Sequence, residues 1–260
     1  MNDLDVKSPG TEKHSAFSKV PEVTLVFWIL KILATTLGET GGDAVSMSMG
    51  LGYLLSTAIF AVFFIIAVVI QVSARKFHPV IYWLTIVATT TVGTTLADFA
   101  DRTLGIGYAG GSAILLCLLA ASLFAWYRVM GSVAVDTVSS PKSEVFYWVT
   151  IMFSQTLGTA LGDWTADTEG LGYGGGIIVF GTLLIILAAL YFWTKISHTV
   201  LFWAAFILTR PLGAVVGDFL DKPLNRGGLA LSRYLASAVL VALMLCFIFC
   251  FSHRPAKRTH

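Results

Sequence analysis

The sequence predicts an all-α membrane protein whose eight transmembrane helices form four parallel two-helix repeats in the order A-B-A-B. Two observations predict this fold class. The 260 residues are 56% hydrophobic and only 12% charged, with a mean hydropathy of +0.80, which is too apolar for a soluble protein. Tryptophan and aspartate also recur along the chain at one constant spacing. We expect pseudo-two-fold or pseudo-four-fold symmetry about the membrane normal.

Eight apolar runs have the length of a bilayer span, roughly 18 to 23 residues. They lie near residues 23–42, 51–72, 80–97, 108–128, 145–162, 173–194, 198–217 and 229–251. The repeats are predicted at 23–77, 78–130, 143–197 and 198–251, with a polar linker at 131–142 and a basic tail at 252–260. Residues 1–22 predict a disordered tail without a signal-peptide cleavage site.

The lysines and arginines are unevenly distributed over this topology. Only Arg102, Lys222, Arg226 and Arg233 fall on the side opposite the tails. By the positive-inside rule both termini are therefore expected to be cytoplasmic.

The repeats are recognised from four ungapped copies of one pattern. Tryptophan precedes aspartate by 15 residues in the pairs Trp28 and Asp43, Trp83 and Asp98, Trp148 and Asp163, and Trp203 and Asp218. Five residues before each aspartate stands Gly38, Gly93, Gly158 or Gly213, and directly before it stands Gly42, Ala97, Gly162 or Gly217. Such small-xxx-small patterns let membrane helices pack closely. The aspartates are 55, 65 and 55 residues apart, which suggests two successive duplications.

Each repeat contains two spans, so all four copies enter the membrane in the same direction. Parallel repeats are related by rotation about the membrane normal. We therefore expect the four first helices to lie together near a central axis.

With these tryptophans and glycine-aspartate ends, the chain resembles a family of bacterial multi-pass membrane proteins with four tandem two-span repeats of unknown function. The resemblance covers residues 23–251 and implies the repeat architecture and a location in the bacterial inner (plasma) membrane. It implies no activity. The fourth repeat departs from the pattern, with Pro211 in place of threonine and "NRGG" in place of the Gly-x-Gly-Tyr that opens the other second helices.

A polar stripe is predicted on each first helix, because positions eight, seven and four before the aspartate share its face. Its members are Thr35, Thr36 and Glu39 in repeat one, Thr90, Thr91 and Thr94 in repeat two, Gln155, Thr156 and Thr159 in repeat three, and Arg210, Pro211 and Ala214 in repeat four. Such groups must face protein or water, since unpaired polar groups are costly in lipid.

Arg210 lies deep within its span, where a charge is a functional candidate by default. Glu39 stands four residues before the aspartate of its repeat, whereas Arg210 stands eight residues before its own aspartate, so the two differ in depth by about one helical turn. We therefore predict a Glu39–Arg210 pair. Either this pair only locks the bundle, or Arg210 has a gating or charge-compensating role.

The four aspartates, with Asp101, Asp167, Glu169 and Asp221 nearby, predict an acidic outer face that concentrates cations. Carboxylates and threonine hydroxyls suit Mg²⁺, Mn²⁺, Ca²⁺ or protons, and a bound divalent cation is the one cofactor we consider. The alternative is that each aspartate only caps its hairpin.

The remaining motifs have simpler interpretations. We expect the four tryptophans to be interfacial anchors, Lys31 to snorkel toward the same interface, and the Gly-x-Gly-Tyr segments to allow close packing. Cys117, Cys246 and Cys250 show no disulfide or zinc spacing and are expected to be packing residues.

The leading hypothesis is a non-enzymatic transporter or channel for a hard cation, with the bilayer and the cation as partners and a homo-oligomer left open. An intramembrane enzyme acting on a lipid or quinone would be favoured by a lipid-open pocket beside Asp98 and Asp101. A scaffold or sensor would be favoured by a solid core around Arg210. His78 and His198 lie in loops, and nothing indicates nucleotide, haem or nucleic-acid binding.

Overall fold

The computed structural model describes residues 18–168 and 170–256 and is built from α-helices. Eight long helices follow one another: α1 (Leu25–Asp43), α2 (Gly52–Ser73), α3 (Pro79–Asp98), α4 (Tyr108–Met130), α5 (Pro141–Asp163), α6 (Gly172–Trp193), α7 (His198–Asp221) and α8 (Arg233–Cys250). Six of them, all but α1 and α5, are long and apolar enough to cross a membrane. The eight helices lie where the apolar runs predicted them, although α5 begins earlier and α8 later than expected.

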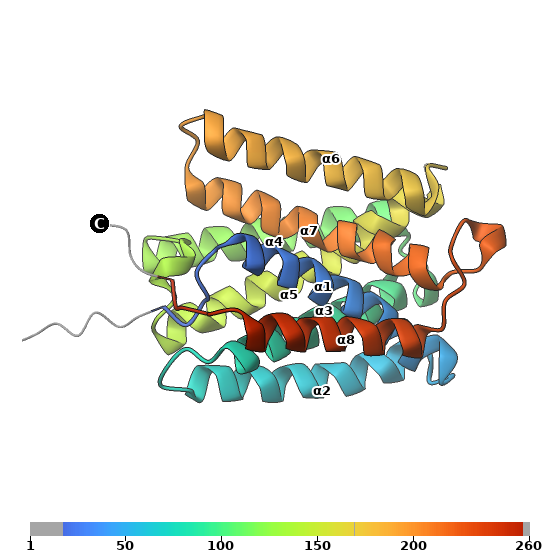
Figure 1. Cartoon of the computed structure of the whole chain (residues 1–260), viewed down its shortest axis with the longest axis horizontal. Coiled ribbons are helices and arrows are strands. Elements are labelled where there is room, and N and C mark those ends of the chain that lie inside the picture. The colour runs from blue at the N-terminus through green and yellow to red at the C-terminus, as the bar shows by residue number, and fades with distance from the viewer. Residues whose placement is uncertain (1–17, 169, 257–260) are drawn as a thin grey trace, which may run out of the picture.

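The first helices of the four repeats, α1, α3, α5 and α7, form the centre of the molecule (Figure 1). Each packs against two others, in the closed order α1, α3, α5, α7 and back to α1, and we call this the central ring. In the most apolar stretches of α3 and α7, 67% of residues are buried, compared with 11% in α2, α4 and α6. The outer helices therefore present apolar side chains outward, as a lipid environment requires.

Each second helix packs on the first helix of the following repeat. Helix α2 lies against α3, α4 against α5 and α6 against α7, and α8 returns to α1. Each repeat is thus packed against the next around the ring, and the second helix of repeat four packs against the first helix of repeat one.

Glycines bring the ring helices together in the way that the small-xxx-small patterns predicted. In each ring helix, the glycine five residues before the aspartate faces the next ring helix, at the residue eight before that helix's own aspartate. A Cβ atom there would clash at Gly38, Gly158 and Gly213, and at Gly93 it would meet the next helix at 3.0–3.1 Å. The pairs are Gly38 with Thr90, Gly93 with Gln155, Gly158 with Arg210, and Gly213 with Thr35. The small residue next to the aspartate has a similar role, and its Cβ would meet the next helix at 3.1 Å for Gly42, 3.0 Å for Gly162 and 2.7 Å for Gly217.

Two glycines of α1 provide a matched test of this packing. Gly38→Ala is expected to lower the free energy of unfolding by about 1–3 kcal/mol, because the new methyl group overlaps the Thr90 side chain. Gly41→Ala is the control: nothing lies within 4 Å of its Cβ position, and alanine is the better helix former by about 0.5–1 kcal/mol. The measurement is the midpoint of unfolding by sodium dodecyl sulfate in mixed micelles. Equal midpoints for the two variants would contradict the close packing.

At the aspartate end, three of the four ring helices continue into a π-helical segment. These segments are Ala44–Ser48, Phe99–Thr103 and Trp164–Thr168, each directly after its aspartate. The glycines that follow serve the backbone rather than close packing: Gly52 has φ +72° and Gly107 has φ +77°, with open space around both. This corrects our expectation for the Gly-x-Gly-Tyr segments. Repeat four has a short 3₁₀ turn, Leu224–Arg226, in place of the π-helical segment.

At the other end of the bundle, aromatic side chains fill the ring. Trp83, Trp148 and Trp203 are 1%, 2% and 5% exposed and pack edge-on or tilted against neighbouring aromatic rings. The expectation of interfacial anchors is therefore wrong for these three, and only Trp28 is partly exposed. The reason is the helix face: a residue 15 positions before a buried aspartate lies near the same inward face at 100° per residue.

Residues 18–22 pack against the same end, and we call them the strap. The Lys19 ammonium lies 2.7 Å from a carboxylate oxygen of Glu144 on α5 and donates to the Val72 carbonyl at 3.0 Å. The strap also pairs with the C-terminal segment through the amide of Ala256 and a bridge between Pro21 and Pro255. The predicted disordered tail is therefore ordered from residue 18, and its earlier part lies outside the described residues. Both described chain ends lie at this end of the bundle (Figure 1).

The three cysteines do not pack inside the protein as expected. Cys117, Cys246 and Cys250 are exposed on the outer helices α4 and α8. They lie far from the ring and play no part in the site below.

Candidate functional site

Arg210 occupies the middle of the ring and is completely buried. Its Nη2 donates to Glu39 Oε2 at 3.0 Å and to Thr94 Oγ1 at 2.6 Å, and it also donates to the hydroxyl of Thr159. The predicted Glu39–Arg210 pair is therefore present. The three acceptors all stand four residues before the aspartate of their own helices, so repeats one, two and three converge on the arginine of repeat four.

The other threonines of the predicted stripe are also buried, and their hydrogen-bond partners depend on their position before the aspartate. At the positions seven before the aspartate, Thr36, Thr91 and Thr156 each donate to the carbonyl four residues earlier in their own helix. The hydroxyls of these threonines are therefore satisfied within their own helices. At the positions eight before the aspartate, Thr35 donates to the Ile32 carbonyl of its own helix at 2.9 Å and lies 3.3 Å from the Thr209 carbonyl of the neighbouring α7, and Thr90 packs on Gly38.

Lys31 lies inside the ring and does not snorkel. It is fully buried, donates to Gln155 Oε1 at 3.2 Å and lies 4.1 Å from the centroid of the Phe206 ring. Among the ion pairs of the described residues, none includes Lys31. The expectation failed because Lys31 stands on the inward face, where an amide and an aromatic ring receive its ammonium.

The four repeat aspartates form an acidic layer bridged by two cations in a pseudo-two-fold arrangement. Arg102 Nε lies 2.7 Å from Asp98 of its own repeat, and its Nη2 lies 2.9 Å from Asp163 of the next repeat. Lys222 Nζ lies 3.0 Å from Asp218 of its own repeat and 2.5 Å from Asp43 of the next repeat. All four aspartates are buried, with exposures of 1–3%.

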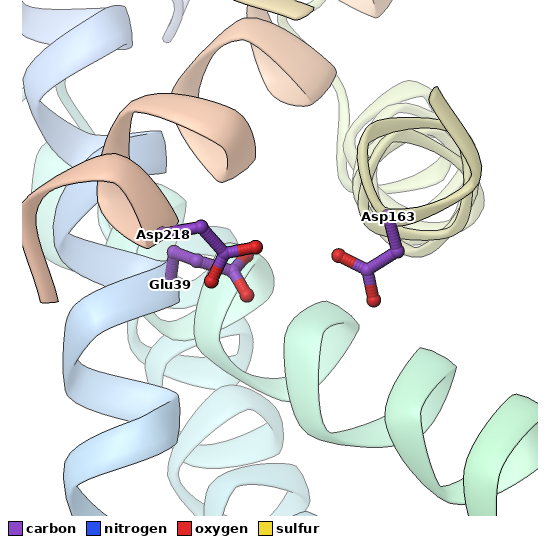
Figure 2. A group of neighbouring side chains, drawn as sticks. All are labelled: Glu39, Asp163 and Asp218. Carbon is purple, nitrogen blue, oxygen red and sulfur yellow. The ribbon is translucent and has the colours of Figure 1, made fainter. Parts of the chain in front are cut away.

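Glu39 lies close to two aspartates of the acidic layer. One carboxylate oxygen from each of Glu39, Asp163 and Asp218 lies within 4.8 Å of the others, and we call these residues the central triad. Figure 2 shows Asp163 on α5 pointing toward Glu39 on α1 and Asp218 on α7. A second group, Asp43, Asp218 and Asp221, meets the same spacing and is called the outer triad. Asp98 belongs to neither triad and is joined to them through Arg102.

The surrounding acidic residues differ in their partners. Asp221 pairs with Arg233 at 3.0 Å, and the exposed Asp167 lies 3.8 Å from Arg102. Asp101 is buried against Gly111 of α4 with one oxygen unpaired. Glu169 lies outside the described residues.

The hairpin-capping alternative finds little support. Asp43 and Asp98 make no side-chain hydrogen bond to the π-helical segments that follow them. The partners of the aspartates are instead Arg102 and Lys222, whose importance the sequence reasoning missed. The signal was present in "DFADR" and "DFLDK", which place a cation four residues after the aspartate in repeats two and four.

The central charges do not balance. The six carboxylates of Glu39, the four repeat aspartates and Asp221 face four cations, Arg102, Arg210, Lys222 and Arg233, the last of which lies 3.0 Å from Asp221 and 3.7 Å from Asp43. With all of them ionised, this cluster carries two negative charges in excess. A buried excess of this kind requires a bound cation or protons.

Lys222 stands just beyond the end of α7 and stays positively charged. Burial alone would lower the pKa of its ammonium, but Asp218, Asp43 and Asp221 raise that pKa above the ordinary range for lysine. The acidic layer therefore holds Lys222 as a cation at physiological pH.

The site is closed to solvent in this conformation. Arg210 is fully buried, and Glu39, Asp163 and Asp218 are at most 3% exposed. An open hollow of about 590 Å³ lies outside the ring, between the start of α2 and Thr103, and its lining includes none of the residues of either triad.

Comparison with known proteins identifies the repeats. Residues 26–77, 81–132, 146–197 and 201–255 match the family described as Repeat of Unknown Function (DUF347). No curated protein and no solved structure matches the chain. The four matches cover most of the sequence, and the chain belongs to this family.

Proposed function

We propose that this member of the DUF347 family is a membrane transporter of a hard divalent cation, of the Mn²⁺, Mg²⁺ or Ca²⁺ type. In this proposal all eight helices cross the bacterial inner membrane, and both termini are cytoplasmic. Helices α1 and α5 carry more polar residues than a single span normally tolerates, but they lie in the central ring where other helices cover them.

The observation that carries the proposal is the uncompensated charge of the acidic layer. Two excess negative charges match one divalent cation. The central triad offers three carboxylate oxygens within 4.8 Å of one another, and Thr94 and Thr159 supply hydroxyls close by. Oxygen ligands of this kind suit hard cations, which are bound at about 2.0–2.6 Å.

The closed ring favours a transporter over an open channel. The central triad is buried from both ends of the bundle, by the aromatic layer and strap on one side and by Arg102 and Lys222 on the other. An ion can enter or leave only after one of these closures opens. This is the arrangement expected of an occluded state in alternating access.

The test is metal uptake into proteoliposomes that contain the purified protein. Asp218→Asn is expected to reduce Mn²⁺ flux at least about ten-fold, because it removes a ligand shared by both triads. Glu22→Gln is the control, since Glu22 is an exposed carboxylate in the strap, at the other end of the bundle. Unchanged flux of Mn²⁺, Mg²⁺ and Ca²⁺ in the Asp218→Asn protein would rule the proposal out.

A scaffold or sensor subunit is the second candidate, and the solid core around Arg210 is the observation that favours it. A protein of this kind would bind no ion and would keep its fold when the acidic layer is neutralised. An intramembrane enzyme is less well supported, because the described hollow reaches neither Asp98 nor Asp101.

A further inference from the structure

We infer that the Lys222 side chain is a tethered cation that occupies the ion site and must withdraw before a metal ion binds, whereas Arg102, its pseudo-two-fold equivalent, is a permanent clamp. The inference rests on the proposed function and names the residue that controls access to its site. Four observations carry it.

The first observation is where the Lys222 ammonium lies. Nζ is 2.5 Å from Asp43 Oδ2 and 3.0 Å from Asp218 Oδ1, and both residues belong to the outer triad. A metal ion held by the same two carboxylates at about 2.0–2.6 Å would overlap the ammonium, although the 3.0 Å contact to Asp218 is longer than a metal–oxygen bond. The ammonium and a metal ion therefore exclude one another at this position.

The second observation is that Lys222 and Arg233 together leave oxygens of the outer triad unpaired. Asp43 Oδ1 and Asp221 Oδ1 are buried without a hydrogen-bond partner, and Asp43 is only 1% exposed. A single ammonium has three donors and a small charge, while a divalent ion accepts six or more oxygens. Asp218 also belongs to the central triad, so an ion that replaced the ammonium would connect the two triads.

The third observation is the contrast with Arg102. Its planar guanidinium uses Nε for Asp98 and Nη2 for Asp163, and Asp167 lies 3.8 Å away. A fork of this kind holds two carboxylates in a fixed geometry, whereas lysine presents one charge on a flexible stem. Withdrawal therefore breaks fewer directed contacts for Lys222 than for Arg102.

The fourth observation is the backbone that carries each cation. Arg102 lies inside the π-helical segment Phe99–Thr103. Lys222 lies just after the last residue of α7, with extended φ and ψ of −72° and 153°, and the 3₁₀ turn Leu224–Arg226 follows. The only ring helix without a π-helical end is thus the one that carries the lysine. The Lys222 backbone is held by the hydrogen bond from its N–H to the Asp218 carbonyl and by that from the Ala230 N–H to its own carbonyl, so withdrawal is a movement of the flexible side chain.

The inference predicts opposite changes in Mn²⁺ affinity for two substitutions of Lys222. With Lys222 withdrawn, the six carboxylates face three cations instead of four, which strengthens binding of a divalent ion. Lys222→Met is expected to bind Mn²⁺ at least about ten-fold more tightly than the wild type, and to transport it more slowly because the bound ion is no longer displaced. Lys222→Arg is expected to bind it at least about ten-fold more weakly, since a guanidinium would clamp Asp43 and Asp218 as Arg102 clamps its own pair.

The experiment measures Mn²⁺ binding to the full-length protein in detergent by electron paramagnetic resonance, and Mn²⁺ flux in proteoliposomes. Lys195→Met is the control, because Lys195 is exposed between α6 and α7. If the wild type binds Mn²⁺ and neither Lys222 variant changes the affinity, the tethered-cation inference is overturned and the transporter proposal stands. If folded wild type and both variants bind no Mn²⁺ and the wild type shows no flux of Mn²⁺, Mg²⁺ or Ca²⁺ in proteoliposomes, the transporter proposal itself fails. Should Lys222→Met not fold, the Lys222→Arg protein alone decides, since wild-type affinity in that variant contradicts the inference.

Discussion

Replacement of Arg210 by methionine is expected to lower the free energy of unfolding by about 3–5 kcal/mol. The change leaves the Glu39 carboxylate buried at 2% exposure without its partner, and it takes a donor from Thr94 and Thr159. An unpaired buried charge is among the largest single destabilising effects known. Because three repeats converge on Arg210, the loss should be felt as global unfolding rather than local fraying.

The measurement is the midpoint of unfolding by sodium dodecyl sulfate in mixed micelles. Arg226→Met is the control, since Arg226 is an exposed arginine in the α7–α8 loop. The double variant Arg210→Met, Glu39→Gln should recover most of the lost stability, because it removes both charges at once. An Arg210→Met protein as stable as the wild type would show that the pair does not hold the ring together.

Replacement of Lys19 by methionine is expected to release the strap while leaving the helices folded. Lys19 neutralises Glu144, which is 1% exposed, and its ammonium also binds carbonyls at the end of α2. Removing one partner of a buried ion pair costs about 3–5 kcal/mol, which corresponds to an opening that is at least about 100-fold more frequent. Hydrogen exchange at the amides of Lys19, Glu22 and Ala256 should accelerate accordingly.

Two variants separate this effect from a general loss of stability. Lys142→Met removes an exposed lysine two residues before Glu144 and should leave exchange unchanged. Lys19→Met combined with Glu144→Gln should restore much of the protection, because no unpaired carboxylate remains. Wild-type exchange rates in Lys19→Met would mean that apolar contacts alone hold the strap.

Periodic features of the sequence predicted the fold well. The apolar runs located all eight helices, and the spacing of tryptophan, glycine and aspartate marked the first helix of each repeat. The glycines proved to lie against the next ring helix as small residues at helix interfaces do. The Glu39–Arg210 pair also followed from the sequence, because two opposite charges on equivalent faces of a buried ring have few other partners.

Side-chain direction at the helix ends was harder to predict. Trp83 and Lys31 stand near the end of a span, where the sequence pattern does not distinguish positions that face lipid from positions that face the ring. The usual preference of these residue types for the membrane interface therefore decided the prediction, whereas both side chains are buried in the ring. The partners of the aspartates were missed for another reason. Arg102 and Lys222 bridge successive repeats, and a bridge between helices that are distant in sequence depends on the order of packing around the ring.

The order in which each second helix packs on the following repeat has an evolutionary consequence. In a half-length ancestor with two repeats, the last helix would have had no following repeat to pack on. Two copies of such an ancestor could have closed the ring together, each packing its last helix on the first helix of the other. The ends of the described chain, residues 18–22 and 254–256, meet at the strap, and the linker at 131–140 lies at the equivalent point between the halves. New termini placed in that linker, with the old ends joined, should therefore yield the same bundle, and separately expressed halves should reassemble into it.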